Sequence, residues 1–304
     1  MAPDLILRGG GVEAGLRPSV GGAFTHFTDL TGAEPVDLLR RARPDFTDVL
    51  DSAGFPLVPF CNRVRDGRFV FAGREVRLSP NLPGQKHPLH GQGWRSAWTV
   101  ADSGSSFAEL VFDHPAGEWP WAYRATLAVA LEDRGMTVTL SARNMSDQIM
   151  PCGLGLHPYY PCNNQTVLDT DVAAVWTVDE EIMPVNRIAA TGRYTLNNRL
   201  ICGQDLDNGY DGWSGDAVLR WPDRARALRL TSPAPRFQVY SPRAGGLIAA
   251  EPVTNANAAL NEPSFHWEAL GLSLLQPGEA VSMTARFEAL TLGAPPNASP
   301  GVPA

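Results

Sequence analysis

Lysine is nearly absent from this sequence, since Lys86 stands alone beside 24 arginines in 304 residues. An enzyme that works through a Schiff base would have to use Lys86 as its amine. A Walker-type phosphate loop needs a lysine directly after a glycine-rich turn, and no glycine-rich stretch here supplies one. The composition therefore disfavours both classes of enzyme.

Cysteine, positive charge and long apolar runs are also scarce. The four cysteines form no C-x-x-C pair, so we expect free, buried thiols in a reducing compartment. The net charge of −7 disfavours a nucleic-acid partner, which needs a basic face. No apolar run reaches the ~18 residues of a membrane span, and no signal-peptide pattern opens the chain. We expect a soluble, cytoplasmic protein that binds neither nucleic acid nor membrane.

Short strands dominate what is present, with glycines and prolines between them. Alternating apolar and polar residues predict hairpins of 68–71 with 74–78, 123–132 with 136–142, and 217–221 with 227–230. Further strands are expected at 237–240, 246–250 and 281–290, and only 34–41 and 257–260 could form short helices or turns. The pattern predicts an all-β protein, an antiparallel β-sandwich or barrel, with one domain over residues 1–292 and a disordered tail over 293–304.

Six histidines are candidates for acid–base chemistry. His157 follows a strand of small and apolar residues and precedes a proline, so its position is fixed and its imidazole can exchange a proton near neutral pH. His87 and His90 form an H-x-x-H in an irregular loop, where a metal site competes with a solvated loop. The remaining histidines occupy loop-like or structural contexts: His26, His114 and His266.

Polar groups beside apolar segments are the other candidates. Glu251 ends an apolar strand, so desolvation would raise its pKa and suit it to act as a general base, although it could also reach water at a sheet edge. Asp207 lies in an Asp-Asn-Gly stretch that ordinary turn chemistry also explains. Arg63 has apolar neighbours and needs a carboxylate or a ligand oxygen as partner. The tryptophans could stack on sugar rings or simply fill the core.

Taken together, the motifs resemble those of the aldose 1-epimerase (galactose mutarotase) family over about residues 10–290. The resemblance rests on segments that occur in the family's order: Asn62-Arg63-Val64, the hairpin at 67–73, Asn81, His90-Gly91, Leu156-His157-Pro158-Tyr159-Tyr160, Leu206-Asp207-Asn208-Gly209-Tyr210, Phe237-Gln238-Val239-Tyr240 and Glu251-Pro252. The family fold, a large antiparallel β-sandwich, agrees with the strand pattern.

The resemblance implies a role for each matching residue. Glu251 would be the general base that removes the proton from the C1 hydroxyl of a sugar. His157 would be the general acid at the ring oxygen, where His90 would assist. The sugar hydroxyls would be held by Asn62, Arg63, Asp207 and Gln238. The substrate would be a free monosaccharide, and no cofactor or metal would be required.

The sequence departs from the family pattern beside the expected pocket. The common His-Gly-Gly is here His90-Gly91-Gln92-Gly93, and Tyr160 stands where phenylalanine is commoner. The Pro-Asp that usually follows the general-base glutamate is replaced in Asn255-Ala256-Asn257-Ala258-Ala259. These changes bear on the preferred sugar more than on the reaction.

Two alternatives remain open at this level. A hexose-6-phosphate epimerase would need an extra cationic clamp, for which the nearby candidates are Arg74, Arg77 and Arg95. A carbohydrate-binding protein without turnover would keep the fold but would not need a matched acid and base. The sequence is compatible with a monomer or a homodimer.

Overall fold

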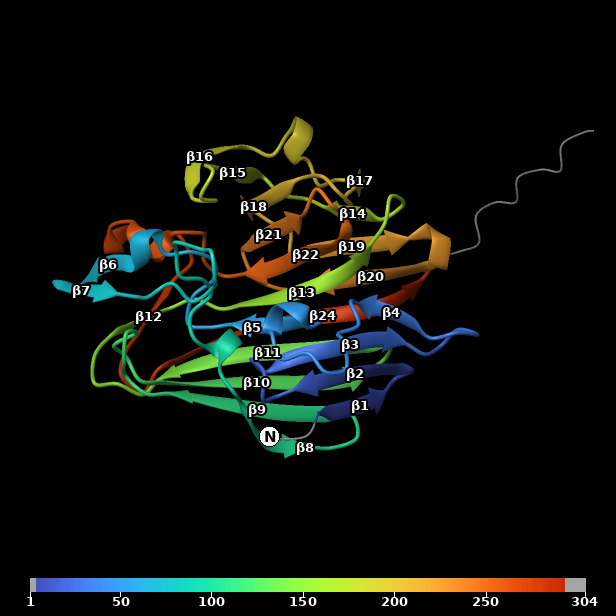
Figure 1. The fold of residues 1–304 in the computed structure, drawn as a ribbon, viewed down its shortest axis with the longest axis horizontal. Helices are drawn as coiled ribbons and strands as arrows, with labels where there is room; N and C mark the ends of the chain where they lie inside the picture. Colours follow the sequence, from blue (N-terminus) through green and yellow to red (C-terminus); the bar gives the residue numbers. More distant parts are fainter. Residues whose placement is uncertain (1–3, 293–304) are drawn as a thin grey trace, which may run out of the picture.

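The computed structural model describes residues 4–292 and consists almost entirely of antiparallel strands (Figure 1). One sheet has eleven strands in the order β1-β2-β3-β5-β13-β22-β21-β18-β15-β16, with β4 paired to β3. Its strands are β1 (Leu5–Gly9), β2 (Val12–Arg17), β3 (Ala23–Asp29), β4 (Val36–Leu39), β5 (Gly54–Leu57), β13 (Gly155–Cys162), β15 (Ala174–Val178), β16 (Pro184–Ala189), β18 (Leu206–Asp211), β21 (Arg236–Ser241) and β22 (Gly246–Val253).

The second large sheet has nine strands in the order β17-β14-β19-β20-β24-β11-β10-β9-β8. Its strands are β8 (Thr99–Ser103), β9 (Phe107–His114), β10 (Tyr123–Glu132), β11 (Gly135–Asn144), β14 (Val167–Thr170), β17 (Arg199–Leu200), β19 (Asp216–Trp221), β20 (Arg226–Thr231) and β24 (Ala280–Thr291). The predicted all-β antiparallel sandwich is thereby confirmed, and so are the three predicted hairpins.

The fold also contains smaller elements besides the two large sheets. Two-stranded ribbons are formed by β6 (Arg68–Phe71) with β7 (Arg74–Arg77) and by β12 (Met150–Cys152) with β23 (Ser273–Leu275). The β6–β7 hairpin extends from one end of the molecule (Figure 1). Seven single-turn 3-10 helices complete the described chain: η1 (Val49–Asp51), η2 (Arg65–Gly67), η3 (Gly93–Arg95), η4 (Gly192–Tyr194), η5 (Pro222–Arg224), η6 (Ala259–Asn261) and η7 (Ser264–His266).

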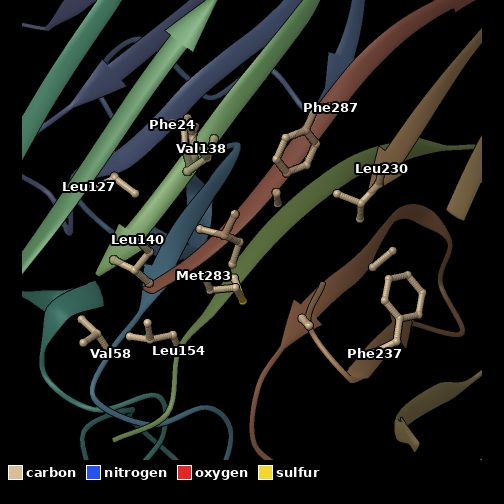
Figure 2. Close-up of a cluster of buried hydrophobic side chains, with 14 of the residues drawn as sticks. Phe24, Val58, Leu127, Val138, Leu140, Leu154, Leu230, Phe237, Met283 and Phe287 are labelled. Atoms are coloured by element: carbon tan, nitrogen blue, oxygen red, sulfur yellow. The ribbon is translucent and has the colours of Figure 1, made fainter. Parts of the chain in front are cut away.

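The main core lies between the two large sheets. Figure 2 shows Leu127, Leu140 and Met283 from the nine-stranded sheet together with Phe24 and Phe237 from the eleven-stranded sheet. All five side chains are buried, in agreement with the inward faces of alternating strands. Because alternate residues point to opposite faces, the other face of β13, β21 and β22 is left to form the site.

A second, smaller apolar cluster supports that outer face. It includes Phe55, Trp94, Tyr159 and Ala249, all buried. Of the four cysteines, which are all free thiols, Cys61, Cys152 and Cys162 are buried and Cys202 is partly exposed.

Two expectations from the sequence were wrong in detail. Residues 34–41 form no helix, because β4 pairs with the open edge of β3 and buries Leu38 and Leu39; eight residues are too few for a helix to persist without such packing. His26 and His114 lie in β3 and β9 rather than in loops. The short helix or turn predicted at 257–260 is confirmed, because η6 forms one turn over Ala259–Asn261.

The predicted tail over 293–304 lies outside the described residues. Within the part of the chain that the structure covers, no helix has the length and hydropathy needed to cross a membrane.

Candidate functional site

A cleft of about 690 Å³ opens on the outer face of the eleven-stranded sheet. All seven residues predicted to act on or bind a sugar line it: Asn62, Arg63, His90, His157, Asp207, Gln238 and Glu251. They come from positions as far apart as 62 and 251, so only the tertiary fold brings them together.

The floor of the cleft is set by the register of three adjacent strands. Gln238 on β21 is directly paired with Glu251 on β22. On the other side of β22, Gly155 pairs with Val253 and Tyr159 with Ala249, which places His157 opposite Glu251. Since these positions share one face of the sheet, their side chains emerge side by side.

His157 and Glu251 form a buried acid–base pair. The Nε2 atom of His157 lies 3.3 Å from Oε1 of Glu251, and the two side chains are 10% and 3% exposed. Burial lowers the pKa of His157 to about 3, and burial together with nearby Asp207 raises the pKa of Glu251 well above its ordinary value. Both shifts favour the uncharged forms, in which one proton lies between the two groups and can be shared by them.

The His157 ring is fixed by aromatic packing. It stacks on Phe55, with ring centroids 4.7 Å apart, and Phe55 is its direct neighbour across β5 and β13. Nδ1 of His157 is buried and has no hydrogen-bond partner among the described residues. The ring nitrogen that faces Glu251 is Nε2.

His90 approaches the pair from a loop. Its ring centroid lies 5.6 Å from that of His157, and its Nδ1 accepts a hydrogen bond from the backbone N–H of Asn62 at 3.0 Å. The neutral ring consequently carries its proton on Nε2. Burial, with smaller contributions from His157 and Arg63, lowers the pKa of His90 well below its usual value.

A connected set of polar side chains forms one wall. Gln238 donates from Nε2 to Oδ1 of Asp207 at 2.8 Å, and Arg63 donates from Nη1 to Oδ1 of Asn62 at 3.1 Å. Nη2 of Arg63 also lies 3.8 Å from Oδ2 of Asp207. Asp207 is thus the carboxylate partner that a poorly exposed arginine requires. Burial raises the pKa of Asp207, although Arg63 opposes that shift.

The unusual Asn255-Ala256-Asn257 stretch holds this wall in place. Asn255 accepts from the N–H of Cys61 at 3.0 Å and donates to the carbonyl of Cys61 at 3.1 Å. Asn257 accepts from the N–H of Arg63 at 3.1 Å. The segment that follows Glu251 thus positions the segment that carries Asn62 and Arg63, a role the sequence alone did not reveal.

The cleft residues that the sequence reasoning missed include Arg40, Tyr159 and Tyr240. Arg40 stacks over the ring of Tyr159, 4.2 Å from its centroid, and donates to the backbone carbonyl of Ser52 at 2.9 Å. Tyr240 lies two residues beyond Gln238 on the same face of β21. Tyr159 and Tyr240 could have been found from their position two residues after a predicted site residue, because strand periodicity is two; Arg40 carried no such signal.

The H-x-x-H motif does not bring two ligands to one point. Nε2 of His87 lies 3.1 Å from Glu181 at the rim, whereas Nδ1 of His90 is engaged by Asn62. In residues 4–292 no group of three or more His, Cys, Asp or Glu side chains is placed to hold a metal ion.

The other sequence candidates lie away from the cleft. Arg74, Arg77 and Arg95 are exposed and do not line it. The side chains of Trp94, Trp98, Trp119 and Trp121 are buried, so packing, the alternative to sugar stacking, accounts for them.

Comparison with known proteins relates this chain to one family. A family model described as Aldose 1-epimerase matches residues 10–288. The "Uncharacterized protein YphB" of Escherichia coli K12 is 32% identical over 251 residues, covering 78% of this chain and 84% of its own length.

Solved structures give the same result. A "Putative aldose 1-epimerase" from E. coli K12 has a TM-score of 0.86 and 29% identity, covering 95% of this chain and 100% of its own. A galactose mutarotase-like protein from Clostridium acetobutylicum has a TM-score of 0.83 with 95% of both chains covered; at 19% identity, that likeness concerns the fold alone.

Proposed function

Because the chain belongs to the aldose 1-epimerase family, we propose that it interconverts the α and β anomers of a free aldose by acid–base ring opening and reclosure. The observation that carries this proposal is the buried pair at the floor of the cleft, with His157 Nε2 3.3 Å from Glu251 Oε1. Opening a cyclic hemiacetal requires one proton to be removed and another to be delivered, and this pair supplies both functions.

The reaction follows from these two roles. Glu251 takes the proton of the C1 hydroxyl while His157 gives a proton to the ring oxygen, so that the bond between C1 and the ring oxygen breaks and C1 becomes an aldehyde. Rotation about C1–C2 exposes the other face of the aldehyde. Reclosure with the proton transfers reversed yields the opposite anomer.

The proton shared by the pair makes this sequence possible. Burial favours the neutral resting pair, and transfer of its proton from Oε1 of Glu251 to Nε2 of His157 produces the carboxylate and imidazolium that the reaction needs. Arg63 lowers the pKa of Glu251 and so favours this charged form. His90, fixed with its proton on Nε2, is suited to donate a hydrogen bond to the ring oxygen.

The polar wall suits a neutral sugar. Asn62, Arg63, Asp207 and Gln238 offer both donors and acceptors, which is what a ring of hydroxyls requires. Sites that hydrogen-bond hydroxyls discriminate strongly against analogues that lack them, because the unpaired polar groups remain buried.

A phosphorylated sugar is less well matched. The three lysine and arginine side chains among the described cleft residues already have partners: Arg40 has Ser52, Arg63 has Asp207, and Lys86 has Glu181. Glu180 also lines the cleft and adds negative charge. A phosphate entering here would compete with these existing partners, so the charge balance supports the free aldose over a hexose 6-phosphate.

Anomer-resolved NMR or polarimetry on freshly dissolved α-anomers of galactose, glucose, xylose and arabinose tests the proposal. We expect the protein to accelerate relaxation to an unchanged equilibrium. Glu251→Gln and His157→Asn should each lose about 10²–10⁴-fold in rate, the usual contribution of a general acid or base. Matched controls are Glu109→Gln and His266→Asn, which change exposed side chains outside the cleft.

Two results would contradict the proposal. Sugar binding by the wild type without faster relaxation would favour a non-catalytic carbohydrate-binding protein. Near-wild-type rates in both site variants, with the fold intact by circular dichroism, would show that the acid and base are other groups.

A further inference from the structure

Cys162 and Cys202 stand at the two ends of one excursion of the chain. The segment between them, residues 163–201, supplies β17 and β14 at one margin of the nine-stranded sheet and β15 and β16 at one margin of the eleven-stranded sheet (Figure 1). Its turn at 180–182 also lines the cleft. A bond between the two sulfur atoms would therefore close this whole segment into a ring at its base.

The two thiols meet beside the turn that leads into β22. Across β13 and β22, Cys162 is paired directly with Gly246. A Cβ added to the preceding Gly245 would lie 3.0 Å from Sγ of Cys202, so this sulfur packs against the same turn. The thiol of Cys202 is a hydrogen-bond partner of the thiol of Cys162. These contacts bring the two sulfur atoms close together.

The backbone segments that carry the two cysteines are also joined. The N–H of Ile201 donates to the carbonyl of Thr166 at 3.1 Å, and the two segments continue into the paired strands β14 and β17. On the other side of Cys202, the N–H of Gln204 donates to Oγ of Ser241 at 3.0 Å. The cysteines are therefore held in place by structure that does not depend on a bond between them.

The four cysteines differ in their access to solvent. Cys202 is partly exposed, and Cys162 beside it is 8% exposed. Cys61 and Cys152 are 2% and 1% exposed, so a reagent in solution reaches neither in the folded protein. Burial, together with the thiol of Cys202, raises the pKa of the Cys162 thiol. Because reactivity follows exposure and thiolate content, Cys202 is the thiol that reacts first.

We propose that Cys162 and Cys202 form a modification site that reacts with a low-molecular-weight disulfide, such as glutathione disulfide, and becomes an intramolecular disulfide bond. Cys202 loses its proton and attacks one sulfur of the reagent, which releases one thiol and leaves a mixed disulfide on Cys202. Cys162 then loses its proton and attacks the sulfur of Cys202, which releases the second thiol. The protein thereby gives two electrons and two protons to the reagent, independently of the proposed reaction on sugars.

The bond would restrain the segment that carries part of the cleft rim. Joining residues 162 and 202 closes a loop of about 40 residues, which removes conformational entropy from the unfolded chain. The expected rise in Tm is about 3–8 °C. Amide hydrogens of β15 and β16 should exchange more slowly in the oxidised protein, because the base of their segment can no longer open.

Treatment of the folded full-length protein with glutathione disulfide at pH 8 tests the site. Peptide mapping by mass spectrometry without reduction should recover a cross-linked pair of peptides that contain Cys162 and Cys202, with Cys61 and Cys152 still open to alkylation after unfolding. The Tm should rise with the cross-link and return to its starting value with dithiothreitol. Cys202→Ser should form no cross-link, whereas Cys152→Ala, at a buried thiol outside the pair, should form it as the wild type does.

A stable glutathione adduct on Cys202 with Cys162 still a thiol would overturn the proposal, because it would show that the second attack is blocked. A cross-link between two copies of the chain, or one between Cys162 and Cys202 that forms only in urea, would overturn it too. So would recovery of all four cysteines as free thiols. None of these outcomes bears on anomer exchange, which is measured separately.

Discussion

Asn62 and His90 are joined by two reciprocal hydrogen bonds that fix the chemical state of the histidine. The backbone N–H of Asn62 donates to Nδ1 of His90 at 3.0 Å, and the backbone N–H of His90 donates to the carbonyl of Asn62 at 2.9 Å. Both residues have left-handed backbone conformations, with φ of 64° and 59°. The loop geometry therefore decides which nitrogen of His90 faces the cleft with a proton.

This geometry predicts the behaviour of His90 in solution. The pKa of His90 is lowered well below 6.5, so at pH 6 the ring should remain neutral with its proton on Nε2. Imidazole ¹⁵N shifts from two-bond ¹H–¹⁵N correlation spectra, assigned with His90→Gln, would report the tautomer directly. Exposed His266 provides the comparison. An imidazolium signal from His90 at pH 6 would contradict the prediction.

Glu251 should make the wild type lose stability as pH rises. Its folded pKa lies above the ordinary 4.5, so above about pH 4.5 the unfolded chain releases a proton that the folded protein keeps. Stability from this group is thus full at low pH and is lost as pH rises towards the folded pKa. Glu251→Gln has no such proton. Its free energy of unfolding, minus that of the wild type at the same pH, should therefore increase from pH 5 to pH 8.

Urea unfolding at four pH values measures that difference. Glu109→Gln, which removes an exposed carboxyl on β9, is the control for loss of one negative charge. A difference between Glu251→Gln and the wild type that stays constant over the whole range would show that Glu251 is ionised in the resting protein.

Gly91 is required both by its backbone conformation and by its surroundings. Its φ is +70°, and an added Cβ would lie 2.3 Å from Cδ of Pro59. Gly73, with φ of +77° and open space around it, is a natural control. Gly73→Ala should cost about 1 kcal/mol for the backbone alone, and Gly91→Ala should cost about 1–3 kcal/mol more from overpacking.

Denaturant unfolding would separate the two glycine variants. Because His90 precedes Gly91, the Gly91→Ala variant should also lose catalytic rate while Gly73→Ala keeps it. Equal destabilisation of the two variants would mean that the His90 loop relaxes freely around the new methyl group.

Asn255 should contribute strongly to stability through its contacts with Cys61. Its side chain is 3% exposed and satisfies both the N–H and the carbonyl of Cys61. Asn255→Ala should therefore destabilise the fold by about 2–4 kcal/mol, since it leaves buried backbone groups unpaired. Asn197→Ala, at an exposed asparagine, should stay within about 0.5 kcal/mol of the wild type. A similar small effect for Asn255→Ala would mean that water replaces both hydrogen bonds.

The β-sandwich could be predicted largely from local pattern. Alternation of apolar and polar residues in 123–132 and 136–142 marks β10 and β11 because each strand buries one face. The failure at β4 has an equally physical cause. Leu38 and Leu39 fit either a short helix or a strand, and only the free edge of β3 decided between them.

The sequence by itself determined the strand periodicity, the absence of a lysine-based site away from Lys86, and the residue types able to exchange protons. Only the tertiary structure decided that Glu251 faces His157, because that contact depends on the register between β13 and β22. It also decided that Asn255 and Asn257 support Cys61 and Arg63, since a hydrogen bond across almost two hundred residues leaves no periodic trace in the chain. Burial completes the site, for the pKa values of the acid and base depend on the surrounding fold and not on their neighbours in sequence.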